Sequence, residues 1–341
     1  MKNNIKKLLN LFAVIAFFTA VSCDDDNSSP NVTVTKVNPG VQYIQDSATL
    51  EGTELDQVKY VFVGNIDAPF TLNGGVITFV VPAGVKPGTN PITLVVDNDM
   101  RVTSSIDVLV KPVPTLTTIN PSAAAAGENV TVYGANLNNS PTVTVGGVAA
   151  TVVSADDSKV VFTVPAVANN KVSSTVEVTT KFGKVATTSI FYASKNLLLN
   201  SGLELGAGDN FDNWGKWNGG TAMFASTVPS EVYSGRALKA TGVGSVGGEW
   251  KTQFGSDEVT TTIGSKYLVY MWIKGATAGG NMRFSTNESA GAQYGGGIDI
   301  GTQWQQVRFE FTAKSAKTKI VLDMGLKAVT YHVDNITMVA Q

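Results

Sequence analysis

Residues 267–274 read Tyr-Leu-Val-Tyr-Met-Trp-Ile-Lys, and their side chains alternate in character with a period of two. Successive side chains of a β-strand point to opposite faces, so this pattern predicts a strand. One face is mostly apolar and is expected in a core: Tyr267, Val269, Met271 and Ile273. The other face mixes aromatic and charged groups and is expected to be half-exposed: Leu268, Tyr270, Trp272 and Lys274. The stretch therefore predicts a sheet with one buried face.

Two neighbouring stretches alternate in the same way. In residues 304–312 the apolar phase is Val307, Phe309 and Phe311. In residues 281–287, Met282 and Phe284 are expected to face the core, which leaves a polar phase on the other side: Arg283, Ser285 and Asn287. Polar strands beside an aromatic one would form a groove lined with hydrogen-bonding groups. Such a groove suits an oligosaccharide better than an apolar small molecule.

Aromatic residues are concentrated in this same region. All five tryptophans follow residue 213: Trp214, Trp217, Trp250, Trp272 and Trp304. Their concentration indicates either an unusual core or a surface that binds something flat. Trp214 and Trp304 are expected to pack. For the other three, and for Tyr294 in its Gly-rich loop, packing and ligand contact both stay open.

The order of segments in residues 195–341 resembles a carbohydrate-binding module of the family 4, 9 and 22 type. The segments that carry the resemblance are 196–204, 234–241, 250–253, 263–275, 304–312 and 331–336. The resemblance implies a galactose-binding-like β-jelly roll that captures polysaccharide by aromatic stacking and hydrogen bonds. The expected ligand contacts are Trp217, Trp250, Gln253, Tyr270, Trp272, Arg283, Asn287 and Tyr294.

The same resemblance implies a structural Ca²⁺ held by Glu204 and Asp334, because hard oxygen ligands suit this ion. The alternative is that the two acids only make capping or turn hydrogen bonds. Glycoside hydrolysis needs two carboxylates that flank one bond in a cleft, and these two match ion-site positions instead. The chain is therefore predicted not to be an enzyme. His332 is the only histidine and is expected at the surface or a cleft edge, with no metal role.

The middle of the chain repeats itself. Landmarks recur in the same order and at a nearly constant offset, with Pro39 matched by Pro121, Gly52 by Gly134, Gly64 by Gly146 and Pro82 by Pro165. This regularity indicates a duplicated domain, here residues 32–111 and 112–194. Short runs rich in Val, Thr and Ile between turn residues predict a small immunoglobulin-like sandwich for each copy.

The second copy resembles the IPT/TIG family over residues 114–193. The resemblance rests on the order of four segments: 114–121, 127–137, 143–147 and 162–165. It implies an immunoglobulin-like fold, and the first copy, residues 32–111, is predicted to be a domain of the same IPT/TIG type. The two copies are interpreted as spacers that lift the last domain off a membrane, and ligand binding or protein docking by them stays open.

The N-terminus is interpreted as a targeting segment. Residues 1–22 begin with lysines and continue as an apolar run that suits a signal peptide. Small residues before Cys23 resemble the lipobox of bacterial lipoproteins, which implies cleavage before Cys23 and lipidation of it. The acidic start of the tether 23–31 resembles a surface-export signal of Bacteroidota lipoproteins. An ordinary secretory signal and a merely solvated tether are the alternatives.

Composition limits the remaining classes of function. A single Cys excludes an internal disulfide framework and a thiolate zinc site. With 25 basic and 27 acidic residues, the chain offers no basic face for nucleic acid.

The sequence thus predicts an all-β protein: two tandem immunoglobulin-like sandwiches followed by a jelly roll. It is expected to be lipid-anchored in an outer membrane and to face the cell exterior. There it would capture a polysaccharide, such as xylan or β-glucan, for an outer-membrane transporter complex. The alternative is an adhesin that binds protein through the immunoglobulin-like domains.

Overall fold

The computed structural model describes residues 31–96 and 99–341. The chain divides into two compact units, Met1–Pro112 and Val113–Gln341. The predicted signal peptide and the predicted lipidation site Cys23 lie outside the described residues. No helix among the described residues is long and apolar enough to cross a bilayer.

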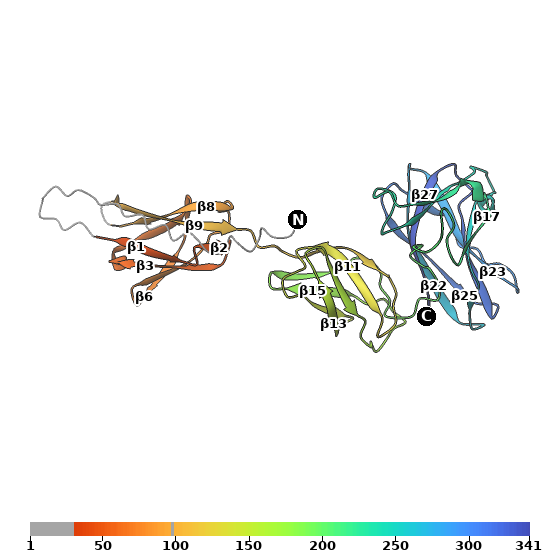
Figure 1. Ribbon diagram of the computed structural model, residues 1–341, viewed down its shortest axis with the longest axis horizontal. Coiled ribbons are helices and arrows are strands. Elements are labelled where there is room, and N and C mark those ends of the chain that lie inside the picture. The colour runs from red at the N-terminus through yellow and green to blue at the C-terminus, as the bar shows by residue number, and fades with distance from the viewer. Residues whose placement is uncertain (1–30, 97–98) are drawn as a thin grey trace, which may run out of the picture. The chain divides into compact units, whose positions relative to one another are not determined.

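The first unit is a sandwich of two sheets, apart from the short helix η1 (Leu55–Gln57) (Figure 1). One sheet has the order β1 (Thr33–Asn38), β3 (Ser47–Thr53), β7 (Val76–Val80) and β6 (Phe70–Asn73). The other has the order β2 (Val41–Tyr43), β9 (Arg101–Leu109), β8 (Gly88–Val95), β4 (Tyr60–Val63) and β5 (Ile66–Asp67). Alternate residues of these strands meet in one core, which includes Leu50, Ile77, Phe79, Ile92 and Ile106.

The second unit begins with a similar sandwich. Its strands follow one path: β10 (Thr115–Asn120), β11 (Asn129–Ala135), β14 (Lys159–Thr163), β13 (Val148–Ala155), β12 (Thr142–Val145), β15 (Val176–Thr180) and β16 (Gly183–Ala186). Strand β13 pairs with both β14 and β12, so it joins the two layers. The core is built from alternate apolar residues such as Val132, Phe162, Val176 and Phe191.

The two sandwiches share an unusual local detail. Pairing of β1 with β3 shifts register after Val34, and pairing of β10 with β11 shifts after Leu116. Beside each shift stands a glycine. A Cβ on Gly52 would overlap the carbonyl oxygen of Thr33, and a Cβ on Gly134 would overlap that of Thr115. A β-bulge brings the two backbones this close, so both copies need glycine at the same place.

The rest of the second unit is a jelly roll of two sheets. The front sheet has the order β17 (Trp214–Asn218), β20 (Gln253–Ser256), β26 (Lys317–Asp323), β23 (Gly280–Glu288) and β24 (Ile298–Ile300), with β21 (Val259–Thr260) also on β26. The back sheet has the order β18 (Met223–Ser226), β19 (Ala237–Thr241), β27 (Thr330–Ala340), β22 (Lys266–Gly275) and β25 (Gln305–Thr312). The predicted all-β class, with two immunoglobulin-like sandwiches before a jelly roll, is confirmed.

The core of the jelly roll lies between its two sheets. It contains the predicted inward phase of β22: Tyr267, Val269, Met271 and Ile273. Met282 and Phe284 from the front sheet also lie in it, as their alternation predicted. Phe309 packs against this core while staying partly exposed, whereas Val307 and Phe311 are buried.

The outward phase of β22 differs from its prediction. Leu268 and Tyr270 are buried, because the immunoglobulin-like domain of the same unit covers them with Ala123 and Tyr192. The hydroxyl of Tyr270 donates to the carbonyl oxygen of Ser122 at 2.8 Å. The prediction of a half-exposed face is therefore wrong at Leu268 and Tyr270. Within this unit the two domains share a small core of their own.

Candidate functional site

A row of polar side chains crosses the outer face of the front sheet. Gln253, Asp323 and Arg283 stand opposite one another on β20, β26 and β23. Their neighbours in each strand point into the core, so these three point outward. Gln253 Nε2 donates to Asp323 Oδ1 at 2.7 Å, and Arg283 Nε donates to Asp323 Oδ2 at 3.0 Å. Asn218 Nδ2 extends the row by donating to Gln253 Oε1 at 2.7 Å.

Asp323 anchors this row. Its side chain is fully buried, and the Arg283 guanidinium neutralises it. Removing one partner of a buried ion pair costs about 3–5 kcal/mol, so the pair fixes where the guanidinium lies. The remaining N–H groups of Arg283 are those of its two Nη atoms, and Nη1 lies 4.0 Å from a Glu249 carboxylate oxygen. They stay available to hydroxyl or anionic groups of a ligand.

Trp217 lies flat on the next row of the same face. Gly215 and Gly255 pair across β17 and β20, and a Cβ on either would meet the indole of Trp217. The register shifts between Lys216 and Asn218, so Trp217 is the extra residue of a β-bulge. The indole thus rests on bare backbone, and 37% of the residue stays exposed. A flat, partly exposed ring on a rigid sheet is a surface on which another flat ring can stack.

Two further rings stand at the edge of this face. Trp250 lies on the short helix η4 (Glu249–Lys251), which directly precedes β20, and is 50% exposed. Tyr294 bridges to Ser285 of β23 and is 62% exposed. The guanidinium of Arg283 lies over the Tyr294 ring at 4.7 Å from its centre. Rings and polar row together are called the aromatic face below.

The structure brings most of the predicted ligand contacts together on the aromatic face: Trp217, Trp250, Gln253, Arg283, Asn287 and Tyr294. Asn287 is exposed and stands opposite Lys319. Sequence reasoning missed Asn218, Glu249, Lys319 and Asp323. A period-two reading of 317–323 would have put Lys319 and Asp323 on the polar side, since Ile320 and Leu322 are buried in the core.

Two predicted contacts lie on the back sheet instead. Tyr270 has no exposed surface, so the prediction that it meets a ligand is wrong; it is a contact between domains. Trp272 stacks on Tyr233, with ring centres 4.2 Å apart and planes at 14°. Tyr233 also meets Trp304 edge-on at 5.6 Å. Trp214 is buried and stacks on Phe254, which agrees with its expected packing role.

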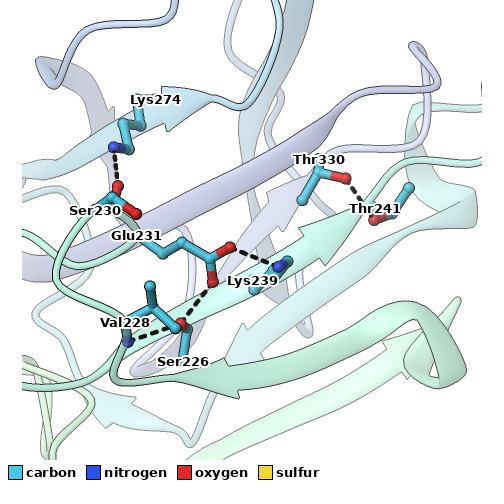
Figure 2. Close-up of polar contacts among 8 residues, drawn as sticks. All are labelled: Ser226, Val228, Ser230, Glu231, Lys239, Thr241, Lys274 and Thr330. Carbon is cyan, nitrogen blue, oxygen red and sulfur yellow. Dashed lines mark hydrogen bonds and ion pairs between the residues drawn. The ribbon is translucent and has the colours of Figure 1, made fainter.

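The outer face of the back sheet is partly covered by the segment that follows β18 (Figure 2). Glu231 accepts from Ser226 at 2.6 Å and from Lys239 at 2.7 Å, and Lys274 donates to the carbonyl oxygen of Ser230. His332 stands between Lys239 and Lys274 in the sheet and is only 3% exposed. The prediction of a surface histidine is therefore wrong. Burial is the main reason why the pKa of His332 is lowered.

Glu204 lies close enough to Asp334 for its charge to act on the Asp334 carboxyl, and the calcium ion stays a prediction. Asp334 is buried and accepts backbone N–H groups of Tyr233, Ser234 and Asn335 at 3.1, 2.8 and 2.7 Å. Burial, with the Glu204 charge adding to it, raises the pKa of Asp334 to about 8. Burial also raises the pKa of Glu204.

The Glu204 carboxylate lies where a Cβ on Gly235 would be, so the local chain leaves room for it beside Asp334. The Glu204 charge disfavours ionisation of Asp334, and two carboxylates at one place fit a hard cation in donor type. No group of three or more His, Cys, Asp or Glu that could hold a metal exists in the described part of the chain. Any further ligands would therefore be backbone carbonyls, side-chain amide or hydroxyl oxygens, or water.

A cavity of about 290 Å³ lies outside the aromatic face. Its walls are residues 195–199, Asn213 and 256–260. It contains none of the residues of the aromatic face, which is an open surface and not an enclosed pocket.

Comparison with known proteins identifies one domain of the chain. Residues 114–193 match the family described as the IPT/TIG domain, which confirms the resemblance of the second copy. A comparison with curated proteins found no match.

Several solved structures are similar to the chain. One is a surface glycan-binding protein from Prevotella bryantii, with 16% identity and a TM-score of 0.33 over 92% of this chain and 99% of that one. Another comes from a complex xyloglucan utilization locus in Bacteroides uniformis, with 16% identity and a TM-score of 0.33 over 92% and 100%. A third is a carbohydrate-binding module in complex with β-1,4-galactotriose, with 18% identity and a TM-score of 0.35 over 43% and 100%.

Proposed function

We propose that the chain captures a polysaccharide on the aromatic face without cleaving it. One observation carries the proposal: exposed rings lie beside a fixed row of hydrogen-bonding side chains on one rigid sheet. Sugar rings present C–H faces that pack on aromatic rings, and their hydroxyls need polar partners nearby. The face supplies both on side chains whose partners are already in place, so little ordering is needed when the ligand binds.

The acids of the aromatic face favour binding over hydrolysis. Asp323 is buried and bound by two donors, and Glu249 lies beside the same guanidinium. Hydrolysis of a glycoside requires one carboxylic acid and one free carboxylate on either side of the bond. The described residues of this face do not present such a pair.

The remaining parts of the proposal concern location. The chain would be cleaved before Cys23 and held by lipid in the outer membrane, facing outward beside a transporter complex. One lipid chain binds a membrane only weakly, so stable anchoring requires more than one chain on Cys23. Labelling with a radioactive fatty acid, compared with a Cys23→Ala variant, tests the anchor. Label retained in the variant would overturn it.

A structural Ca²⁺ at Glu204 and Asp334 is part of the same proposal. The ion would hold both carboxylates in their charged form and would tie the start of the jelly roll to its last strand. Thermal unfolding at pH 8 with calcium and with a chelator tests it. Equal melting temperatures would remove the ion from the proposal.

The binding proposal is tested with the chain from residue 24 onward in affinity gels that contain plant polysaccharides, xylan and β-glucan among them. Retardation is expected on at least one polymer. Trp217→Ala and Tyr294→Ala are each expected to weaken it about tenfold, the equivalent of roughly 1.4 kcal/mol. Tyr60→Ala is the control, since Tyr60 is a ring of the first unit that is about as exposed as Tyr294. Retardation by no polymer, or equal loss in the control, would contradict the proposal.

A further inference from the structure

Each exposed ring of the aromatic face has a cation beside it. Lys319 Nζ lies 5.7 Å from the centre of the Trp217 ring, and Lys251 Nζ lies 5.9 Å from that of Trp250. The Arg283 guanidinium lies 4.7 Å from the centre of the Tyr294 ring. The three positive groups come from different elements: β26, η4 and β23. Positive charge therefore accompanies every ring on which a sugar could stack.

The carboxylates of the aromatic face lie near Arg283 but not near the two lysines. Asp323 and Glu249 are both directed at Arg283, at 3.0 and 4.0 Å. In the described part of the chain, neither Lys319 nor Lys251 has a carboxylate within ion-pair distance. Lys251 instead donates to the hydroxyl of Ser245 at 2.8 Å. Two ammonium groups thus stay unpaired on the face, although the chain as a whole carries a net charge of −2.

Cation–π attraction to the rings is an alternative explanation for the positions of Lys319 and Lys251. It contributes only about 0.5–1 kcal/mol at exposed sites, and it leaves the ammonium able to meet an anion at the same time. Lys319 also stands opposite Asn287, whose side chain is exposed. Lys319 thus lies beside the Trp217 ring and opposite Asn287 on the neighbouring strand. An anionic substituent on a sugar would form a charge-assisted hydrogen bond with the Lys319 ammonium, whereas a neutral sugar offers only hydroxyl oxygens, which bind it more weakly.

We propose that the polysaccharide bound by the aromatic face is anionic, with carboxylate or sulfate groups that meet Lys319 and Lys251 while the sugar rings stack on Trp217 and Trp250. This inference rests on the function proposed above and specifies its substrate class. The two kinds of anion share the chemistry that the lysines recognise. Binding to such a polymer would weaken as salt screens the charges.

The test uses the chain from residue 24 and pairs of polymers that differ only in charge. Polygalacturonate and glucuronoxylan are compared with their carboxyl-reduced forms, and dextran sulfate is compared with dextran. Calorimetry is run at about 20 mM and about 300 mM NaCl, where screening lengths differ several-fold. At least one anionic polymer is expected to bind about tenfold more tightly than its neutral counterpart at low salt and to lose that advantage at high salt. Which polymer does so separates carboxylate from sulfate.

Charge-removing variants show where the anion binds. Lys319→Gln and Lys251→Gln are each expected to weaken binding of the anionic polymer roughly fivefold, the effect of one charge pair in water, and to leave the neutral polymer unaffected. Lys266→Gln is the control, because Lys266 is an exposed lysine on the back sheet and its loss changes net charge equally. Equal losses in all three variants would mean non-specific attraction and would overturn the inference.

The failures of the two proposals are distinguishable. If neutral polymers bind as tightly as their anionic counterparts and Trp217→Ala abolishes that binding, the anionic inference is wrong and polysaccharide capture stands. If no polymer binds, both fall.

Discussion

Replacing Tyr270 by Ala should destabilise the whole second unit. The ring is completely buried between the jelly roll and the immunoglobulin-like domain, 5.8 Å from the ring of Tyr192. Removing a buried aromatic side chain costs about 3–5 kcal/mol in unfolding free energy. Tyr270→Phe keeps the ring and removes only the hydroxyl. Because the Ser122 carbonyl oxygen still accepts from Tyr192 N at 3.0 Å, this change should cost about 1 kcal/mol.

Urea unfolding followed by tryptophan fluorescence measures both variants, since every tryptophan lies in this unit. If the two domains of this unit unfold cooperatively, the unfolding curve should show a single transition, and its midpoint should move to lower urea concentration. Tyr60→Ala, which removes an exposed ring from the first unit, is the control and should leave this transition within about 0.5 kcal/mol of the unaltered chain. A loss below about 1 kcal/mol in Tyr270→Ala would refute the claim that this ring holds the domains together.

Three further predictions concern the front sheet and the buried acid. Gly255→Ala should displace the Trp217 indole and weaken polysaccharide retardation in affinity gels as much as Trp217→Ala does; unchanged retardation would contradict the stacking geometry. Arg283→Met should leave the buried Asp323 carboxylate without its charged partner and cost about 3–5 kcal/mol in urea unfolding, and a neutral result would contradict the role of the pair. Without calcium, the raised pKa of Asp334 means that this carboxyl contributes its full stabilisation below about pH 4. The contribution is lost as the pH rises toward about 8. Asp334→Asn should flatten this slope in chelator-treated protein, and an unaltered slope would assign it to another group.

Alternation along single strands predicted the core of the jelly roll correctly. Tyr267, Met271 and Phe284 lie in it because the apolar phase of a strand must face the other sheet. The same rule failed at Tyr270 and His332. Their side chains do point away from that core, but a second domain covers one and a folded-back segment covers the other. Period-two alternation describes only which face a residue is on, and what covers that face is a long-range contact.

The sequence predicted several residues of the aromatic face, but not how the strands bring them together. The concentration of tryptophans and the Gly-rich loop around Tyr294 pointed to Trp217, Trp250 and Tyr294, although Trp217 lies on strand β17. The bulge that turns Trp217 onto the face depends on pairing between β17 and β20, which no local pattern reveals. Asp323 was missed because an acid at the end of a strand is usually solvated. Asp323 can be buried because Gln253 and Arg283 on the neighbouring strands both donate hydrogen bonds to its carboxylate.

The buried contact around Tyr270 also determines where the chain can be cut. A fragment that began near residue 195 would expose Leu268, Tyr270 and Val339 to water as one apolar patch. Exposed apolar patches promote self-association, so such a fragment is expected to aggregate or to form dimers through this surface. A fragment that begins at Val113 keeps the patch covered. Polyvalent retention by an aggregated module would imitate high affinity, so binding assays should use the longer fragment.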